Sequence, residues 1–263
     1  MQTIDLAHRF LGGADTAPPV VLLHGLLGSA RNWQSAGRLL ARDFRVYVPD
    51  LRNHGESPHD PVMDYPSMVA DLLAWMDKND LKRVHLVGHS MGGKVAMYLS
   101  SRCPERVISL TVVDIAPRAY PPRWEKEFAI MQRMPVAQFS KRLDAEQWLE
   151  EFVHDWAFRK FLVSNLDGES AGGFKWAINL DVLESALPNL FVQVPEDGWR
   201  YDGRVLFLRG SRSRFIEDSD STLINRLFPF ATLETIDDAG HNVHFDQPEA
   251  FVKAIKVHME KAK

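Results

Sequence analysis

The sequence predicts an α/β protein with a mostly parallel central sheet, helices on both faces of the sheet and an inserted helical cap. Two observations lead to this fold class. Short apolar runs, most of them β-branched, alternate with longer stretches in which apolar residues recur every three or four positions. Such repetition of strand and helix places the strands parallel and covers both faces of the sheet.

The predicted elements follow one another along the chain. Strands are expected at residues 20–24, 45–49, 84–88, 107–113, 205–209 and 231–236. Helices are expected at residues 31–42, 65–79, 90–102, 217–227 and 248–261. The sequence shows no internal repeat, low-complexity tract or flexible linker, which favours one domain.

One segment breaks the alternation. Residues 118–203 have helical spacing but no convincing strand, and they hold five of the seven tryptophans, at positions 124, 148, 156, 176 and 199. We therefore predict a core made of residues 1–117 and 204–263, with residues 118–203 inserted as a helical cap. Most of these aromatic side chains are expected to pack the cap onto the core, and a few to line a pocket.

Composition narrows the class of partner. The chain has 263 residues, 45% of them hydrophobic and 25% charged, which suits one sizeable domain. Its formal charge is −4 and no segment gathers Lys or Arg, so neither nucleic acid nor an anionic membrane is expected as a partner. A small molecule is the expected partner, while the oligomeric state stays open.

The single cysteine and the first residues bear on the compartment. Cys103 alone allows no internal disulfide and no thiolate metal cage. No metal and no other cofactor is expected. Asp5, His8 and Arg9 interrupt the region where a signal peptide would be apolar, and no window approaches the roughly 20 apolar residues of a membrane-spanning helix. A cytoplasmic location is expected.

A nucleophile is predicted at Ser90. The segment Gly88-His89-Ser90-Met91-Gly92 has the G-x-S-x-G pattern and lies between a predicted strand and a predicted helix. A sharp turn at this point strains its central residue, and the two glycines relieve the crowding on either side. The alternative, that Ser90 only caps a helix, accounts for one residue of the five.

A serine hydroxyl needs a base to take its proton, and histidine suits this role because its pKa lies near neutrality. Among the ten histidines, His241 follows the last predicted strand and its loop, which is the third place in a chain order of serine, acid and histidine. His244 is the nearest rival, and we expect it to pack beside the site.

Four motifs now stand in order: HGLLGS at 24–29, DLRNHGES at 50–57, the serine turn at 88–92 and AGH at 239–241. In this order they resemble the α/β-hydrolase fold family. The segments LRNHGESPHD, GHSMGGK and VVDIAP are most similar to those of YbfF-like bacterial esterases. The resemblance implies a serine hydrolase that cleaves carboxylic esters or acyl thioesters.

The acid departs from the common family pattern. The resemblance leads to an Asp in the turn after strand 205–209, but Ser213 stands there, and a serine cannot stabilise an imidazolium as a carboxylate does. Asp114 ends the strand at 107–113 on the edge of the sheet that carries Ser90, and the matching VVDIAP favours it as well. Glu217 and Asp218 remain alternatives, although they resemble first-turn acids of the next helix.

Further residues complete the predicted site. Gly25 permits a turn that aims the Leu26 amide into the site, and the Met91 amide is the expected second donor of an oxyanion hole. Leu27, Trp156 and Trp176 are the candidate substrate-binding residues. To the motif Arg52-Asn53-His54-Gly55 we assign no chemistry beyond shaping a turn.

The expected function is hydrolysis of esters or thioesters through an acyl-enzyme on Ser90. Two alternatives keep the triad and change the bond, namely a carbon–carbon bond hydrolase and a perhydrolase. A third alternative is a receptor on the same fold that binds a small ligand without catalysis.

Overall fold

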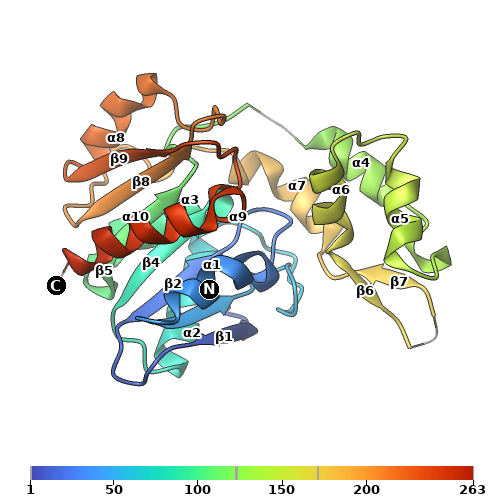
Figure 1. The fold of residues 1–263 in the computed structure, drawn as a ribbon, viewed down its shortest axis with the longest axis horizontal. Coiled ribbons are helices and arrows are strands. Elements are labelled where there is room, and N and C mark those ends of the chain that lie inside the picture. Colours follow the sequence, from blue (N-terminus) through green and yellow to red (C-terminus); the bar gives the residue numbers. More distant parts are fainter. Residues whose placement is uncertain (1, 122–123, 171, 263) are drawn as a thin grey trace.

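A computed structural model describes residues 2–121, 124–170 and 172–262 and contains a seven-stranded sheet between layers of helices (Figure 1). The strand order is β1-β3-β2-β4-β5-β8-β9. All neighbouring strands are parallel except β1, which pairs antiparallel with β3. The strands are β1 (His8–Gly12), β2 (Pro19–Leu23), β3 (Arg45–Pro49), β4 (Val84–His89), β5 (Val107–Val113), β8 (Val205–Gly210) and β9 (Ala231–Ile236). The predicted fold class is confirmed.

The core consists of two clusters, one on each face of the sheet. Successive side chains of a strand point to opposite faces, so Val20 and Leu22 of β2 join one cluster while Val21 and Leu23 join the other. This double burial explains why the strands are unbroken apolar runs in the sequence. The first cluster packs under α1 (Gln34–Leu40) and α10 (Pro248–Glu260), and the second under α2 (Tyr65–Lys78), α3 (Met91–Arg102) and α8 (Ser221–Leu227).

Two predicted helices are divided in the structure. The helix expected at 31–42 begins as a 3-10 turn, η1 (Ala30–Trp33), because Ser29 and Asn32 form a capping box there before α1 starts. The helix expected at 217–227 likewise begins as η4 (Asp218–Asp220) before α8. Two short elements, η2 (Pro104–Arg106) and α9 (Val243–Asp246), complete the core.

The segment between β5 and β8 forms a lobe beside the sheet, yellow and green in Figure 1. It contains α4 (Glu125–Arg133), η3 (Val136–Gln138), α5 (Arg142–Leu149), α6 (Trp156–Val163) and α7 (Leu180–Leu190). It also contains a hairpin of β6 (Leu166–Gly168) and β7 (Phe174–Trp176), which the sequence did not predict because three-residue strands leave no readable period.

The two ends of this lobe lie together. Strands β5 and β8 are neighbours in the sheet, so the chain leaves and re-enters at adjacent positions. Backbone hydrogen bonds join the two stems: the Tyr120 amide donates to the Phe191 carbonyl over 2.8 Å, and the Val194 amide to the Pro117 carbonyl over 2.8 Å.

Within the described parts of the chain, no helix combines the length and apolar character that crossing a membrane requires.

Candidate active site

The turn between β4 and α3 carries Ser90 in a strained conformation. Its φ of 52° and ψ of −118° lie in a region that non-glycine residues rarely adopt, and such strain gathers at functional sites. Neighbouring glycines make this turn possible. A Cβ atom on Gly88 would lie 2.2 Å from the Gly92 carbonyl oxygen, and one on Gly92 would lie 2.5 Å from the His24 carbonyl oxygen.

Asp114 lies at the end of β5, the strand beside β4. Its side chain is fully buried, and its Oδ2 accepts a hydrogen bond from Nδ1 of His241 over 2.8 Å. The Gly210 amide donates to Oδ1 over 3.1 Å, and the Ser213 hydroxyl donates to Oδ2. Three donors therefore hold a buried carboxylate against the imidazole. Because Nδ1 of His241 is the donor, a neutral ring presents Nε2 as an acceptor.

Ser213 has a role that sequence reasoning missed. In the sequence this residue marks only the place of the missing Asp, whereas in the structure its hydroxyl donates to Asp114. The turn that follows Ser213 also contacts His241, because the Phe215 ring stacks on the imidazole with ring centroids 3.9 Å apart. A hydroxyl in place of the expected carboxylate was the only available signal.

The alternative acids lie elsewhere. Glu217 caps η4, and its amide donates to Asp220 over 2.9 Å. Asp218 pairs with Arg209 over 2.7 Å. Among the described residues, neither carboxylate contacts His241, so the geometry favours Asp114 as the partner of this histidine.

Ser90 and His241 line one cavity of about 600 Å³. In the described parts of the chain no hydrogen bond joins the Ser90 hydroxyl to the imidazole, which is common in sites without substrate, where such contacts tighten only on binding. The His241 side chain is 24% exposed and remains accessible from this cavity.

Two buried histidines surround His241 without competing for its role. His89 donates through Nε2 to the His241 carbonyl over 2.9 Å, and His244 stacks on Trp33 with centroids 4.1 Å apart. Burial lowers the pKa of His89 well below its usual value and the pKa of His244 to about 3. Both rings are therefore neutral at physiological pH and place no positive charge beside His241.

The predicted oxyanion donors flank the serine. The loop at Gly25 runs beside Ser90, since a Cβ on Gly25 would lie 3.2 Å from the serine Cβ. Among the described residues the Leu26 amide has no hydrogen-bond partner. Met91 is the first residue of α3, a position whose N–H has no acceptor within its helix. Both Leu26 and Met91 line the cavity.

Of the three candidate substrate-binding residues, the structure brings Trp156 alone to the described lining. Leu27 is fully buried, and Trp176 lies in β7 of the hairpin. The Trp156 side chain is 63% exposed, and the Phe245 side chain, on the core side of the same cavity, is 68% exposed. Most of the lining is apolar, including Leu26, Ile115, Tyr120, Trp124, Phe158, Phe161, Leu190 and Phe191.

A buried lysine at the cavity was also missed. Lys94 donates to the Arg118 carbonyl over 2.9 Å and to the Val192 carbonyl, one on each stem of the lobe. Burial lowers the pKa of its ammonium to about 7. The GHSMGGK motif contained this residue, but its sequence position gives no sign of partners so far along the chain.

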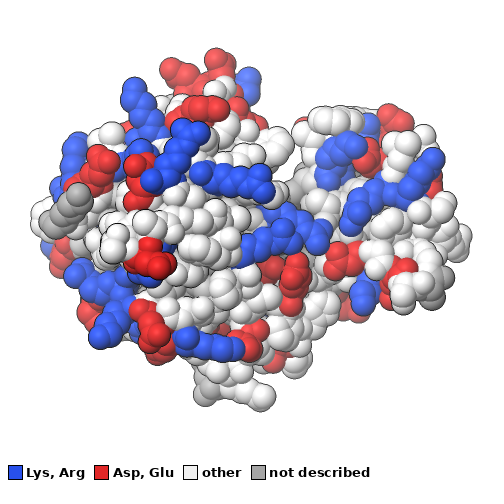
Figure 2. Space-filling model, turned by 60° about the horizontal axis from the view of Figure 1, so that its bottom comes forward, with Lys and Arg blue, Asp and Glu red and all other residues white. Residues whose placement is uncertain are grey.

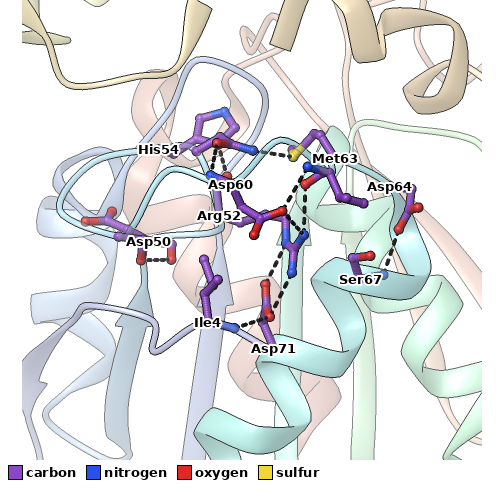
Figure 3. Close-up of polar contacts among 12 residues, drawn as sticks. Ile4, Asp50, Arg52, His54, Asp60, Met63, Asp64, Ser67 and Asp71 are labelled. Carbon is purple, nitrogen blue, oxygen red and sulfur yellow. Dashed lines mark hydrogen bonds and ion pairs between the residues drawn. The ribbon is translucent and has the colours of Figure 1, made fainter. Parts of the chain in front are cut away.

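The motif Arg52-Asn53-His54-Gly55, to which the sequence assigned no chemistry, supplies one partner of a buried ion pair, shown in Figure 3. Arg52 binds Asp71 of α2 through two hydrogen bonds of 2.7 and 2.9 Å, and both side chains are buried. The same guanidinium contacts Asp60 and the Val62 carbonyl, and Asp71 also accepts from the Ile4 amide.

Charge is distributed without a dominant sign on the face shown in Figure 2, where basic and acidic side chains are interspersed. Among the described residues no three His, Cys, Asp or Glu side chains are grouped as a metal site requires. Besides Ser90 and the histidines, the polar side chains that line the cavity include Asn32, Lys94, Asp155, Lys160, Ser164, Asn242 and Asp246.

Comparisons with known proteins identify the family and the fold. The sequence model of a family described as "alpha/beta hydrolase fold" matches residues 18–248. The sn-1-specific diacylglycerol lipase ABHD11 of Xenopus laevis is 39% identical over 269 residues, covering 99% of this chain and 86% of that protein. Esterase YbfF of Escherichia coli K12 is 33% identical over 244 residues, covering 90% and 91%. The solved structure titled "Marine microorganism esterase" has a TM-score of 0.93 and 34% identity, covering 97% of this chain and 100% of that one.

Proposed function

Since this chain belongs to the α/β-hydrolase fold family and is a carboxylic ester hydrolase, we propose that it acts through an acyl-enzyme on Ser90. The family expected from the sequence motifs is confirmed, as is its relation to YbfF-like esterases. The proposal concerns the chemistry within that family: which residues react, and on which acyl compounds.

In the proposed mechanism Ser90 Oγ bonds to the acyl carbon while its proton passes to Nε2 of His241. The carbonyl electron pair moves to oxygen, and the amides of Leu26 and Met91 stabilise the resulting oxyanion. The intermediate then collapses to an acyl-serine, and the leaving alcohol or thiol takes the proton from His241. A water molecule then bonds to the acyl carbon while His241 takes its proton, and the acyl–serine bond breaks. The carboxylic acid is released, and the proton returns from His241 to the Ser90 oxygen.

The observation that carries this proposal is the 2.8 Å hydrogen bond between buried Asp114 and Nδ1 of His241. A fixed carboxylate in that position selects the tautomer that accepts a proton at Nε2, and stabilises the imidazolium that forms. The serine and this histidine line the same cavity, which supports their acting on one substrate.

An apolar acyl group fits the cavity best. Its volume of about 600 Å³ and aromatic lining suit a carboxylic ester with a medium or long acyl chain. The diacylglycerol lipase activity in the names of several relatives supports such substrates. Acyl thioesters remain a second substrate class, since the same steps apply to them.

We also propose that residues 118–203 serve as the cap of this site. Trp156, Phe158 and Phe161 of α6 line the cavity together with Leu190 and Phe191 at the end of α7. The lobe therefore contributes much of the surface that an acyl chain would contact, while the core contributes the reacting groups.

Ser90→Ala tests the nucleophile. We expect turnover of p-nitrophenyl esters to fall about 10⁴-fold or more, with an unchanged melting temperature, because the reacting oxygen is lost and little else changes. A fluorophosphonate probe should label the wild type at Ser90 and leave the variant unlabelled, as peptide mass spectrometry would report.

Two of the competing functions, the receptor and the carbon–carbon bond hydrolase, predict different results. Folded wild-type protein that binds esters but resists the probe would mean a receptor without catalysis. Labelled protein that cleaves diketones faster than any ester or acyl-CoA of graded chain length would mean carbon–carbon bond hydrolysis. Either outcome overturns the proposal.

A further inference from the structure

The residue after the proposed oxyanion donor is held in an unfavourable conformation. Leu27 has a φ of 58°, a left-handed value that a non-glycine residue adopts at a cost, and its side chain is fully buried. Such a conformation persists only where the surroundings fix it. The Leu27 N–H belongs to the peptide unit that follows Leu26, and the Leu26 N–H to the unit that precedes it, so the two units meet at the Leu26 Cα. The contacts of Leu27 fix the backbone on one side of that Cα and so bear on the direction of the Leu26 N–H on the other.

The first contact comes from the 50–57 motif. The Leu27 amide donates to Nε2 of His54 over 3.2 Å, and Nδ1 of His54 lies 2.9 Å from the Arg52 carbonyl oxygen. Since Nε2 accepts, the proton of the neutral ring is on Nδ1 and bonds to that carbonyl. A reciprocal bond runs the other way, because the Leu51 amide donates to Nε2 of His24 over 2.9 Å.

His54 is itself fixed. Burial lowers its pKa to about 3, so the ring stays neutral and keeps an acceptor nitrogen at physiological pH. The backbone that receives its Nδ1 proton belongs to Arg52, whose guanidinium is tied to Asp71 (Figure 3). The motif therefore presents one imidazole nitrogen to Leu27 from a rigid support.

The second contact comes from the inserted lobe. Asn165, buried just after α6, donates through Nδ2 to the Leu27 carbonyl over 2.8 Å. The motif also contacts the lobe, because the Asn179 amide donates to the Asn53 carbonyl and its Nδ2 to Asn53 Oδ1, both over 3.1 Å. Leu27 is thus held at its N–H by the core and at its carbonyl by the lobe.

We infer that His54 and Asn165 are positioning residues of the oxyanion hole, holding Leu27 so that the neighbouring Leu26 amide points at the substrate oxygen. This inference rests on the proposed function of Ser90. It gives the Arg52-Asn53-His54-Gly55 motif a task in catalysis, and it makes the donor geometry depend on the seating of the lobe. Neither residue is required to touch substrate.

His54→Asn and His54→Gln form a matched pair. Glutamine can place an oxygen near the position of Nε2 and accept from Leu27, whereas asparagine is too short to reach it. We expect kcat to fall about 10- to 100-fold in His54→Asn, with KM within about threefold of the wild type, and to recover most of that loss in His54→Gln. The inhibition constant of phenylboronic acid, which forms a tetrahedral adduct on serine, should rise with the loss of kcat.

Asn165→Asp tests the contact from the lobe. It is nearly isosteric but replaces the donor to Leu27 with an acceptor, so kcat should fall about 10-fold and boronate binding should weaken in parallel. Asp167→Asn is the control, because Asp167 forms another contact between lobe and core, with Arg31 at 3.5 Å, that does not involve Leu27. Its kcat should match the wild type.

The outcomes separate the two proposals. If the wild type neither binds phenylboronic acid nor reacts with a fluorophosphonate, the proposed function fails. If the wild type does both, three results would overturn the positioning role. The first is a wild-type kcat in folded His54→Asn or Asn165→Asp, and the second is an equal loss of kcat in His54→Asn and His54→Gln. The third is a rise in KM with kcat unchanged. If His54→Asn does not fold, the comparison of kcat and boronate binding between Asn165→Asp and Asp167→Asn tests the positioning role.

Discussion

At the residue scale, the acid on β5 determines which substitutions should damage the site. Asp114 is the carboxylate that contacts His241, while among the described residues Glu217 caps η4 and has no contact with this histidine. An amide at position 114 would keep the shape of the side chain but favour the wrong tautomer of the imidazole. The two positions therefore offer a clean comparison.

We expect Asp114→Asn to lower kcat by about 10⁴-fold, the loss known for the equivalent change in a serine protease triad. Glu217→Gln should remain within about twofold of the wild type. Steady-state hydrolysis of one p-nitrophenyl ester by both variants checks this, with circular dichroism to verify folding. Equal activity of Asp114→Asn and wild type would refute the acid assignment.

Individual residues differ in how far sequence predicts them. Ser90, Asp114 and His241 each follow a strand of the sheet, so a plausible strand order together with the family resemblance could predict that they share one edge. The contacts of Ser213, Lys94 and Asn165 could not, because each depends on the path of a loop or of the inserted lobe. Loop conformation has no periodicity from which to infer it.

At the scale of elements, buried polar contacts connect α2 to the loop after β3. Arg52 and Asp71 are both buried and bond through two pairs of atoms, whereas Lys78 and Asp5 form a pair whose side chains are 64% and 68% exposed. Removing one partner of a buried pair leaves an uncompensated charge, while an exposed pair contributes little.

We therefore expect Arg52→Met to lower the free energy of unfolding by about 3–5 kcal/mol. Lys78→Met should change it by less than about 1 kcal/mol. Urea denaturation followed by tryptophan fluorescence measures both. A loss below about 1 kcal/mol in Arg52→Met would show that this ion pair does not secure α2.

The six predicted strands all occur, because burial on both faces makes them short apolar runs. Strand β1 escaped prediction since it is a half-exposed edge strand with the sequence HRFLG, which combines polar residues with a glycine. The hairpin of β6 and β7 escaped because each strand has three residues. Patterns identify the sheet interior better than its margins.

At the scale of the whole molecule, buried histidines make stability depend on pH. Burial lowers the pKa of His24 to about 4, of His54 and His244 to about 3, and of His89 well below the ordinary 6.5. As pH falls below 6.5 the unfolded chain takes up protons at these rings and the native state does not. Stability is therefore fully present above pH 6.5 and declines as pH falls toward the native pKa values.

Each such histidine contributes a slope of up to about 1.4 kcal/mol per pH unit in this window. We expect the free energy of unfolding to fall by at least about 3 kcal/mol between pH 6 and pH 5, and these four rings together to contribute less than about 1 kcal/mol between pH 7 and pH 8. Urea titrations at these pH values provide the measurement. A flat profile from pH 6.5 to 5 would mean that the rings are charged in the native state.

The paired stems of the lobe have an evolutionary consequence. The Tyr120 amide bonds to the Phe191 carbonyl at the base of the insertion, and the Val194 amide to the Pro117 carbonyl beside them, so the inserted segment leaves and rejoins the core at one place. We expect that a segment of different length or composition could take its place at this junction while the order of the strands stays intact. If residues 118–203 act as the proposed cap, we expect such an exchange to change the acyl group that is accepted and to leave the reacting residues in place, provided that the new segment still supplies the Asn165 contact to Leu27.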